Sequence, residues 1–127
     1  MLIDTDIIIW YMRGNTKARD FLNSNPRFHL SVITYMELVQ GMRNKQELQA
    51  LRQALKNWNA KIIYIDEEIS SKAMFYVEQQ YLSHSIELAD ALIGATSVAY
   101  GKSLLTGNTK HYSIIKEIDV KKFDHRE

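Results

Sequence analysis

The 127-residue sequence predicts an α/β fold, in which a parallel sheet of about four to five strands is flanked by helices on both faces. Short apolar runs alternate along the chain with stretches of helical periodicity. The helical stretches are long enough to cross from one parallel strand to the next. A hydrophobic fraction of 46%, with five Gly and one Pro, is typical of a compact globular chain. We therefore expect residues 1–127 to form a single domain.

Five segments are expected to form strands, because each is a short apolar run between helical patterns. They are Leu2–Asp4, Phe28–Ser31, Ile62–Ile65 and Ser103–Thr106, with Val120–Phe123 as a fifth of weaker pattern.

The first expected helix, Ile7–Met12, is short and is closed by Gly14; we interpret Asp6 as its N-cap in preference to a direct chemical role. Four longer helices are expected at Thr16–Asn23, Lys45–Trp58, Glu67–Leu82 and Leu88–Tyr100. Pro26 stops the first of these, and Asp66 is the expected N-cap of the third. The fourth is rich in small residues, so we expect it to lie close against the sheet and to be buried on most sides.

The composition excludes several classes of site. The chain has no cysteine, so disulfides and thiolate metal sites are excluded. A formal charge of +1 gives no reason by itself to propose nucleic acid. The sequence has neither a signal-peptide pattern nor an apolar run of the roughly 18 residues that a membrane span needs. We therefore expect a cytoplasmic protein without a membrane segment.

Four polar side chains from distant parts of the sequence are expected at one edge of the sheet, because ligands collect at the carboxyl ends of parallel strands. Asp4 ends the first strand, and Asn108 follows the fourth strand by two residues. Glu37 lies just beyond the second strand, and Asp90 opens the helix of small residues.

Three of these residues also have a purely structural interpretation. Thr34 and Glu37 match the capping box, in which the Glu side chain reaches back to the cap backbone. Asp90 would favour a helix N-terminus through the macrodipole, and Asn108 is an ordinary turn residue. Asp4 has no such explanation, because an acid at the end of a core strand still needs a partner.

Carboxylates that meet at this edge would repel one another unless cations neutralise them. Oxygen ligands without cysteine favour Mg²⁺ or Mn²⁺ over zinc. The four histidines, His29, His84, His111 and His125, are too scattered along the sequence to suggest a zinc site. The sequence therefore predicts a site for Mg²⁺ or Mn²⁺.

Four sequence blocks occur in the order and approximate spacing of the PIN domain. They are MLIDTDIIIWYMRG, SVITYMELVQGMR, LADALIGATSVAYG and LLTGNTKHY. More narrowly, the chain resembles the VapC-type toxins of bacterial and archaeal toxin–antitoxin pairs. The resemblance spans nearly the whole chain, and it is the combination of four blocks that is specific.

The resemblance implies a parallel sheet between helices and a Mg²⁺- or Mn²⁺-dependent endoribonuclease whose acidic core is Asp4, Glu37 and Asp90. Asp4 and Asp90 would be direct or water-bridged metal ligands, and Glu37 a ligand or the base that orients a water molecule. Members of this family often form homodimers, and a cognate antitoxin lays a peptide across the acidic groove. RNA is the implied substrate.

Two positions depart from the family pattern. The residue two after the first Asp is commonly Asn or Ser, but here it is Asp6, which adds charge in a supporting position. Many PIN domains have an acid after the fourth strand, where this chain has Asn108, a frequent variant in toxin-like members. Thr106 and Asn108 would hold the metal's water or a phosphate oxygen. We expect Lys110 and His111 as contacts to the RNA backbone, although both also fit exposed loop residues.

Other functions remain open at this point. Asp4 and Asp6 also fit the nucleophile and acid–base pair of a haloacid-dehalogenase-type phosphatase, but the chain lacks the later Gly-Asp motif of that class. The remaining alternatives are a PIN ribonuclease that processes RNA without being a toxin, and an inactive PIN-like module that binds RNA or protein.

Overall fold

The computed structural model describes residues 1–83 and 86–127; of the four histidines, His84 lies outside this part of the chain. All five predicted strands are present and pair in parallel in the order β3-β2-β1-β4-β5. Their bounds are β1 (Leu2–Ile3), β2 (His29–Ser31), β3 (Lys61–Ile63), β4 (Leu104–Thr106) and β5 (Val120–Lys122). Because β1 lies in the middle of the sheet, the segment that follows it starts from the centre of the carboxyl edge.

In the described residues, helices connect the strands, and the predicted ones begin and end within a few residues of their expected bounds. The α-helices are α1 (Thr5–Met12), α2 (Thr16–Ser24), α3 (Val32–Gln40), α4 (Lys45–Asn57), α5 (Glu67–Gln80) and α6 (Leu88–Ala99), and a 3₁₀ helix, η1, spans Thr109–Tyr112. Asp66 caps α5 as predicted, since its side chain accepts a hydrogen bond from the Ile69 amide at 2.9 Å. None of these helices is long and apolar enough to cross a membrane.

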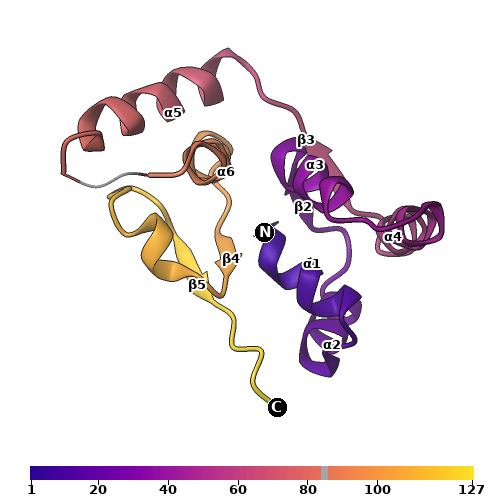
Figure 1. Cartoon of the computed structure of the whole chain (residues 1–127). Coiled ribbons are helices and arrows are strands. Elements are labelled where there is room, and N and C mark those ends of the chain that lie inside the picture. Colours follow the sequence, from indigo (N-terminus) through magenta and orange to yellow (C-terminus); the bar gives the residue numbers. More distant parts are fainter. Residues whose placement is uncertain (84–85) are drawn as a thin grey trace.

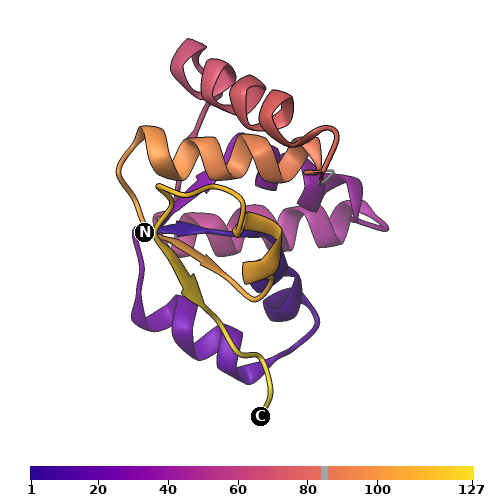
Figure 2. The same ribbon diagram turned by 90° about the vertical axis from the view of Figure 1, so that its left-hand side faces the viewer.

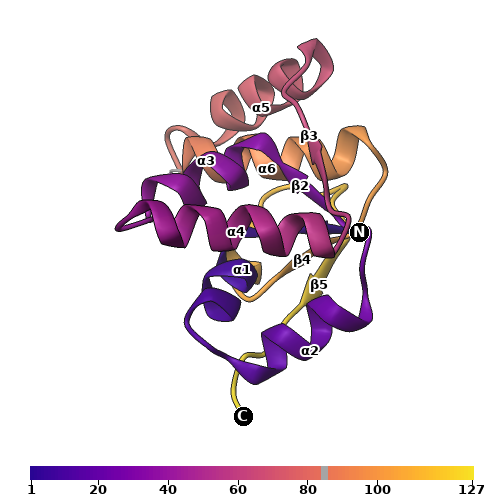
Figure 3. The same ribbon diagram turned by 90° about the vertical axis from the view of Figure 1, so that its right-hand side faces the viewer.

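The sheet separates two apolar clusters, so the α/β architecture with helices on both faces is confirmed. Successive residues of a strand point to opposite faces: Leu2 joins the cluster formed with α5 and α6, and Ile3 joins the one formed with α1, α2 and α4. Figure 1 shows α5 and α6 on one side of the sheet and α1, α2 and α4 on the other. Figures 2 and 3 show these two sides in turn.

Helix α6 is buried on most sides, as its small residues predict. Its buried residues include Ala91, Gly94 and Ala95. A Cβ atom at Gly94 would lie 2.5 Å from the Ile115 Cδ1 atom and 3.4 Å from the Tyr112 ring. Glycine therefore allows the segment that follows β4 to pack directly on α6, which brings Tyr112 towards Asp90.

Two predicted caps are wrong. The N-cap of α1 is Asp4 rather than Asp6: the Asp4 Oδ1 atom accepts a hydrogen bond from the Thr5 amide at 2.7 Å. Strand β1 ends at Ile3 and the helix starts at once, so the acid at the strand's end is also the cap. The N-cap of α3 is Ser31, whose Oγ atom accepts from the Ile33 amide at 3.0 Å. Glu37 is therefore too far along α3 to complete a capping box.

The aromatic residues of α1 are partly buried and contact the core. The Trp10 ring stacks on His125 with 3.8 Å between centroids, and Tyr11 packs edge-on against Trp58 at 4.7 Å. These contacts hold the helix that carries Asp6 against the rest of the domain.

The cap assignment for α3 predicts how two substitutions affect stability. Ser31→Ala removes the acceptor for the Ile33 amide and should lower the free energy of unfolding by about 1 kcal/mol. Glu37→Gln should change it by less than about 0.5 kcal/mol, because Glu37 does not cap the helix. Urea denaturation of both variants measures the difference. A larger loss of stability for Glu37→Gln than for Ser31→Ala would mean that Glu37 does take part in a capping box.

Candidate active site

The predicted acids lie on elements that meet at the carboxyl edge of the sheet. Asp4 directly follows β1, Asp6 lies in the first turn of α1 and Asp90 in the first turn of α6. Glu37 lies on α3, which begins where β2 ends. Asn108 follows β4 and begins η1. The edge predicted from the sequence thus carries all of these residues, but the side chains form separate groups.

Asp4 lies at the centre of this edge and is only 6% exposed. Its Oδ2 atom accepts hydrogen bonds from Thr106 Oγ1 at 2.7 Å and from the Tyr112 hydroxyl at 2.9 Å. Its Oδ1 atom accepts from the Thr5 amide. Among the residues described, no lysine, arginine or histidine forms an ion pair with this carboxylate. Its negative charge is therefore held by hydrogen bonds alone.

Asp90 is joined to Asp4 through Tyr112. The Tyr112 hydroxyl lies 3.4 Å from Asp90 Oδ1, and His111 Nδ1 lies 3.4 Å from Asp90 Oδ2. Burial raises the pKa of Asp90, His111 opposes the rise, and the negative charge of Asp4 adds to it. A bound cation would remove much of this cost, because it favours the charged form of both acids.

Asp6 forms a second acidic position beside the first. Its Oδ2 atom accepts from the Gly107 amide at 2.8 Å and lies 3.4 Å from the Asn108 amide nitrogen. Its Oδ1 atom is buried and has no hydrogen-bond partner among residues 1–83 and 86–127. Burial and then the charge of Asp4 raise the pKa of Asp6 to about 6. An unpartnered buried carboxylate oxygen fits an environment that a cation or an ordered water would complete.

Glu37 is exposed and is held by Thr5. The Thr5 hydroxyl donates to Glu37 Oε1 at 2.7 Å and lies 3.0 Å from the Thr34 hydroxyl. Since Thr5 directly follows Asp4 in the chain, the turn between β1 and α1 fixes both carboxylates. Glu37 is thus oriented by the same turn that places Asp4.

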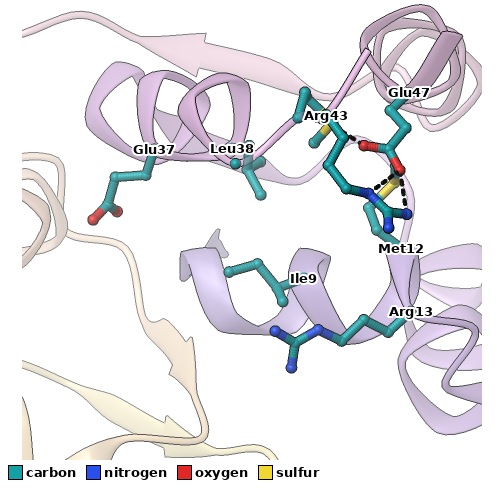
Figure 4. Close-up of a pocket in the computed structure, with 9 residues that line it drawn as sticks. Ile9, Met12, Arg13, Glu37, Leu38, Arg43 and Glu47 are labelled. Atoms are coloured by element: carbon teal, nitrogen blue, oxygen red, sulfur yellow. Dashed lines mark hydrogen bonds and ion pairs between the residues drawn. The ribbon is translucent and has the colours of Figure 1, made fainter.

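Glu37 also lies at one end of a groove of about 440 Å³ between α1, α3 and the start of α4. Ile9 and Leu38 face each other across it, and the Arg43–Glu47 ion pair lies at the far end (Figure 4). The groove has an apolar centre with charged groups at its ends. Glu37 lines this groove, whereas Asp4, Asp6 and Asp90 do not.

The remaining predicted residues differ in what they contact. Thr106 is buried, donates to Asp4 and accepts from the Asn108 amide at 3.0 Å. Asn108 and Lys110 are exposed. His111 is also exposed, but it lies against Asp90. Contact of Lys110 and His111 with RNA stays a prediction.

The donor atoms of the edge suit a hard divalent cation. The arrangement of the side chains suits a metal site only in part. Carboxylate and hydroxyl oxygens line the edge, which suits Mg²⁺ or Mn²⁺. Within residues 1–83 and 86–127, however, no three His, Cys, Asp or Glu side chains lie close enough together to form a ready metal site. Asp4 and Asp90 are linked through the Tyr112 hydroxyl, and Glu37 is held by Thr5, although its charge is among the causes that raise the pKa of Asp90. The three-acid ligand set stays a prediction.

Sequence reasoning missed two residues of the site. No sequence pattern assigns a role to Thr5 or to Tyr112, which lies at the end of the LLTGNTKHY block. Burial identifies Tyr112, since it is 0% exposed and its hydroxyl has carboxylate partners. Burial and the charges of Asp4 and Asp90 raise the pKa of Tyr112, so its hydroxyl remains a donor at neutral pH. The available signal was a polar aromatic residue four positions after the predicted site residue Asn108.

A comparison with protein families decides the family of this chain. The family model described as the PIN domain matches residues 1–117. The chain belongs to the PIN domain family.

Relatives of this PIN domain match over nearly their whole length. Ribonuclease VapC1 of Methanocaldococcus jannaschii is 30% identical over 125 residues, which cover 98% of this chain and 87% of the relative. Ribonuclease VapC10 of Mycobacterium tuberculosis is 29% identical over 122 residues, covering 93% and 90%. A chain in a solved toxin–antitoxin complex from Klebsiella pneumoniae is 28% identical with a TM-score of 0.77, covering 99% and 98%.

The raised pKa of Asp6 predicts a pH-dependent stability in this PIN domain. The folded state binds the Asp6 proton more tightly than the unfolded chain, so this group's contribution to stability falls as the pH rises from about 4 to 6. Asp6→Asn keeps an acceptor for the Gly107 amide and removes the charge. In EDTA at pH 7 it should raise the free energy of unfolding by about 1 kcal/mol, and at pH 4 the gain should vanish.

Denaturant melts across this pH range test the expectation, with Asp119→Asn at the amino end of β5 as the matched control. A loss of stability at pH 7, or a gain that does not change with pH, would show that Asp6 is not strained by its burial and by Asp4.

Proposed function

We propose that this PIN domain is a Mg²⁺- or Mn²⁺-dependent endoribonuclease that cleaves RNA phosphodiester bonds in the cytoplasm, as the toxin of a type II toxin–antitoxin pair. The observation that carries the proposal is the buried Asp4 carboxylate, which has no cationic partner in the described chain and faces Asp90 across the Tyr112 hydroxyl. The relatives named ribonuclease VapC support the same reaction.

Asp4 and Asp90 would hold the cation, and Glu37 would be a further ligand or the group that orients a water molecule. A bound divalent cation lowers the pKa of its water and neutralises charge on phosphate oxygens. Thr5 keeps the Glu37 carboxylate turned towards the acidic edge. Glu37 is exposed and forms no ion pair with a lysine, arginine or histidine in the part of the chain that the structure describes, so it can accept a proton from an attacking water.

The residues that follow β4 at this edge would bind a phosphate group of the RNA. The Asn108 side-chain amide is exposed and can donate to a phosphate oxygen. Lys110 and His111 follow on the same 3₁₀ helix and supply positive charge or donors for the RNA backbone. His111 already lies against Asp90, so a phosphate near that acid would be within its reach.

An antitoxin is the expected protein partner, and a second copy of the chain is expected to form a homodimer. The groove between α1 and α3 ends at Glu37 and combines an apolar centre with Arg13 and Arg43. A partner peptide with apolar side chains would bury them there and cover the acidic edge. Similarity to a chain from a toxin–antitoxin complex supports this arrangement.

The alternatives differ from this proposal in measurable ways. The phosphatase alternative is excluded, because the PIN family model matches residues 1–117. An inactive PIN-like module would bind RNA or protein but would not cleave RNA. A PIN nuclease with a maturation or decay role would cleave RNA but would not co-purify with the product of a small neighbouring gene.

Metal dependence is the first test. We expect cleavage of a long structured RNA with Mg²⁺ or Mn²⁺, loss of cleavage in EDTA, and poor replacement by Zn²⁺, because the ligands are oxygens. Gel analysis of the products measures this. Full activity in EDTA would exclude the proposed chemistry, and no activity with any divalent cation would favour the binding module.

Asp90→Asn separates catalysis from folding. RNA cleavage in Mn²⁺ should fall by about two orders of magnitude or more, since metal activation of water supplies much of the rate. Stability in EDTA should equal or exceed that of the parent, because the repulsion from Asp4 is relieved and the Tyr112 hydroxyl keeps an acceptor. Asp4 is a less clean choice, since it also accepts three hydrogen bonds.

The matched control is Asp119→Asn, which makes the same substitution at the opposite edge of the sheet and should leave cleavage unchanged. A destabilised Asp90→Asn protein that still cleaves RNA in proportion to its folded fraction would mean that Asp90 is only a helix-terminal acid.

A further inference from the structure

Tyr112 has a position that neither the fold nor the proposed reaction explains by itself. It is fully buried, yet its hydroxyl is placed between two carboxylates, 2.9 Å from Asp4 Oδ2 and 3.4 Å from Asp90 Oδ1. A phenylalanine would fill the same space without bringing a polar group into the core. The hydroxyl is therefore expected to act on the acids.

The hydrogen bonds that Asp4 accepts leave few of its acceptor positions free. A carboxylate has about four lone-pair positions, two on each oxygen. Both positions on Oδ2 are used, by Thr106 Oγ1 at 2.7 Å and by the Tyr112 hydroxyl at 2.9 Å. The Thr5 amide uses one position on Oδ1 at 2.7 Å. One acceptor position on Oδ1 is left for any further partner.

The ring of Tyr112 is also held in place. It belongs to the apolar cluster under α6, and a Cβ atom at Gly94 would lie 3.4 Å from its Cδ1 atom. The Ile115 amide donates to the Tyr112 carbonyl oxygen at 3.1 Å, which fixes the backbone at the end of η1. The hydroxyl therefore cannot swing away from Asp4 without disturbing the core.

We propose that Tyr112 is a specificity-determining residue for the cation: by occupying Asp4 Oδ2 together with Thr106, it makes Asp4 a ligand through one oxygen only. This inference rests on the proposed cation-dependent function. Mg²⁺ requires near-ideal octahedral geometry, with carboxylates contributing single oxygens, whereas Ca²⁺ accepts more ligands and bidentate carboxylates. An Asp4 carboxylate that coordinates through a single oxygen therefore favours Mg²⁺ or Mn²⁺ and disfavours Ca²⁺.

Tyr112→Phe tests the proposal, because it frees a lone-pair position on Oδ2 while keeping the ring. The matched control is Tyr76→Phe. Tyr76 is likewise buried, at 3% exposed, and its hydroxyl donates to a carboxylate, Glu117 Oε1, at 3.0 Å. It lies on α5, away from the acids. Thr106→Val is the second variant, since it removes the other donor to the same oxygen and keeps the β-branched shape.

The measurement is the affinity of each purified protein for Ca²⁺ and for Mg²⁺ by calorimetric titration, with no RNA present. The ratio of Ca²⁺ to Mg²⁺ affinity should rise about tenfold in Tyr112→Phe, a change of the size expected when one hydrogen bond to a charged group is lost. Thr106→Val should change the ratio in the same direction. Tyr76→Phe should leave it as in the parent.

The outcomes are distinguishable. A parent protein that binds Mg²⁺ and variants that lower both affinities equally would overturn the role of Tyr112 and leave the proposed function intact, because a merely structural role weakens both cations alike. A ratio that also rises in Tyr76→Phe would overturn it in the same way. A parent protein that binds neither cation would overturn the proposed function and this inference together.

Discussion

The arrangement of the acidic edge depends on the Asp4 carboxylate. One side chain ends the central strand, caps α1 through the Thr5 amide and accepts the hydroxyls of Thr106 and Tyr112. These donors come from α1, β4 and η1, so a single negative charge ties together segments that are more than 100 residues apart in sequence. A buried charge held only by hydrogen bonds tolerates little movement, because losing any donor leaves it further desolvated.

The packing of α6 explains why Asp90 reaches this carboxylate. Gly94 and its small neighbours let the chain after β4 lie directly on the helix, and that chain carries Tyr112. The helix N-terminus and the end of β4 are thereby brought together at one edge. Apolar packing with no chemical role of its own thus sets the separation of the two acids on which the proposed reaction depends.

The acidic edge is destabilising without a positive charge. The pKa values of Asp6 and Asp90 are both raised, first by burial and, among the further causes, by the charge of Asp4. Stability is given up at the position where a cation is proposed to bind, and the strained groups are those that the sequence singled out. The hydroxyl groups of Thr106 and Tyr112 limit this cost at Asp4, and they also restrict which oxygens of that carboxylate stay free.

The sequence by itself determined the strands, the helices other than α3 and η1, and the edge. Apolar periodicity located all five strands, and the rule that parallel strands align their carboxyl ends placed Asp4, Glu37, Asp90 and Asn108 together. It could not assign the caps of α1 and α3, because a capping motif is local and the start of a helix depends on where the preceding strand stops pairing. Only the tertiary structure decided that Tyr112 joins Asp4 to Asp90 and that the Thr5 hydroxyl holds Glu37. Such contacts depend on how α6 and η1 pack against each other, and the spacing of residues along the sequence does not predict that packing.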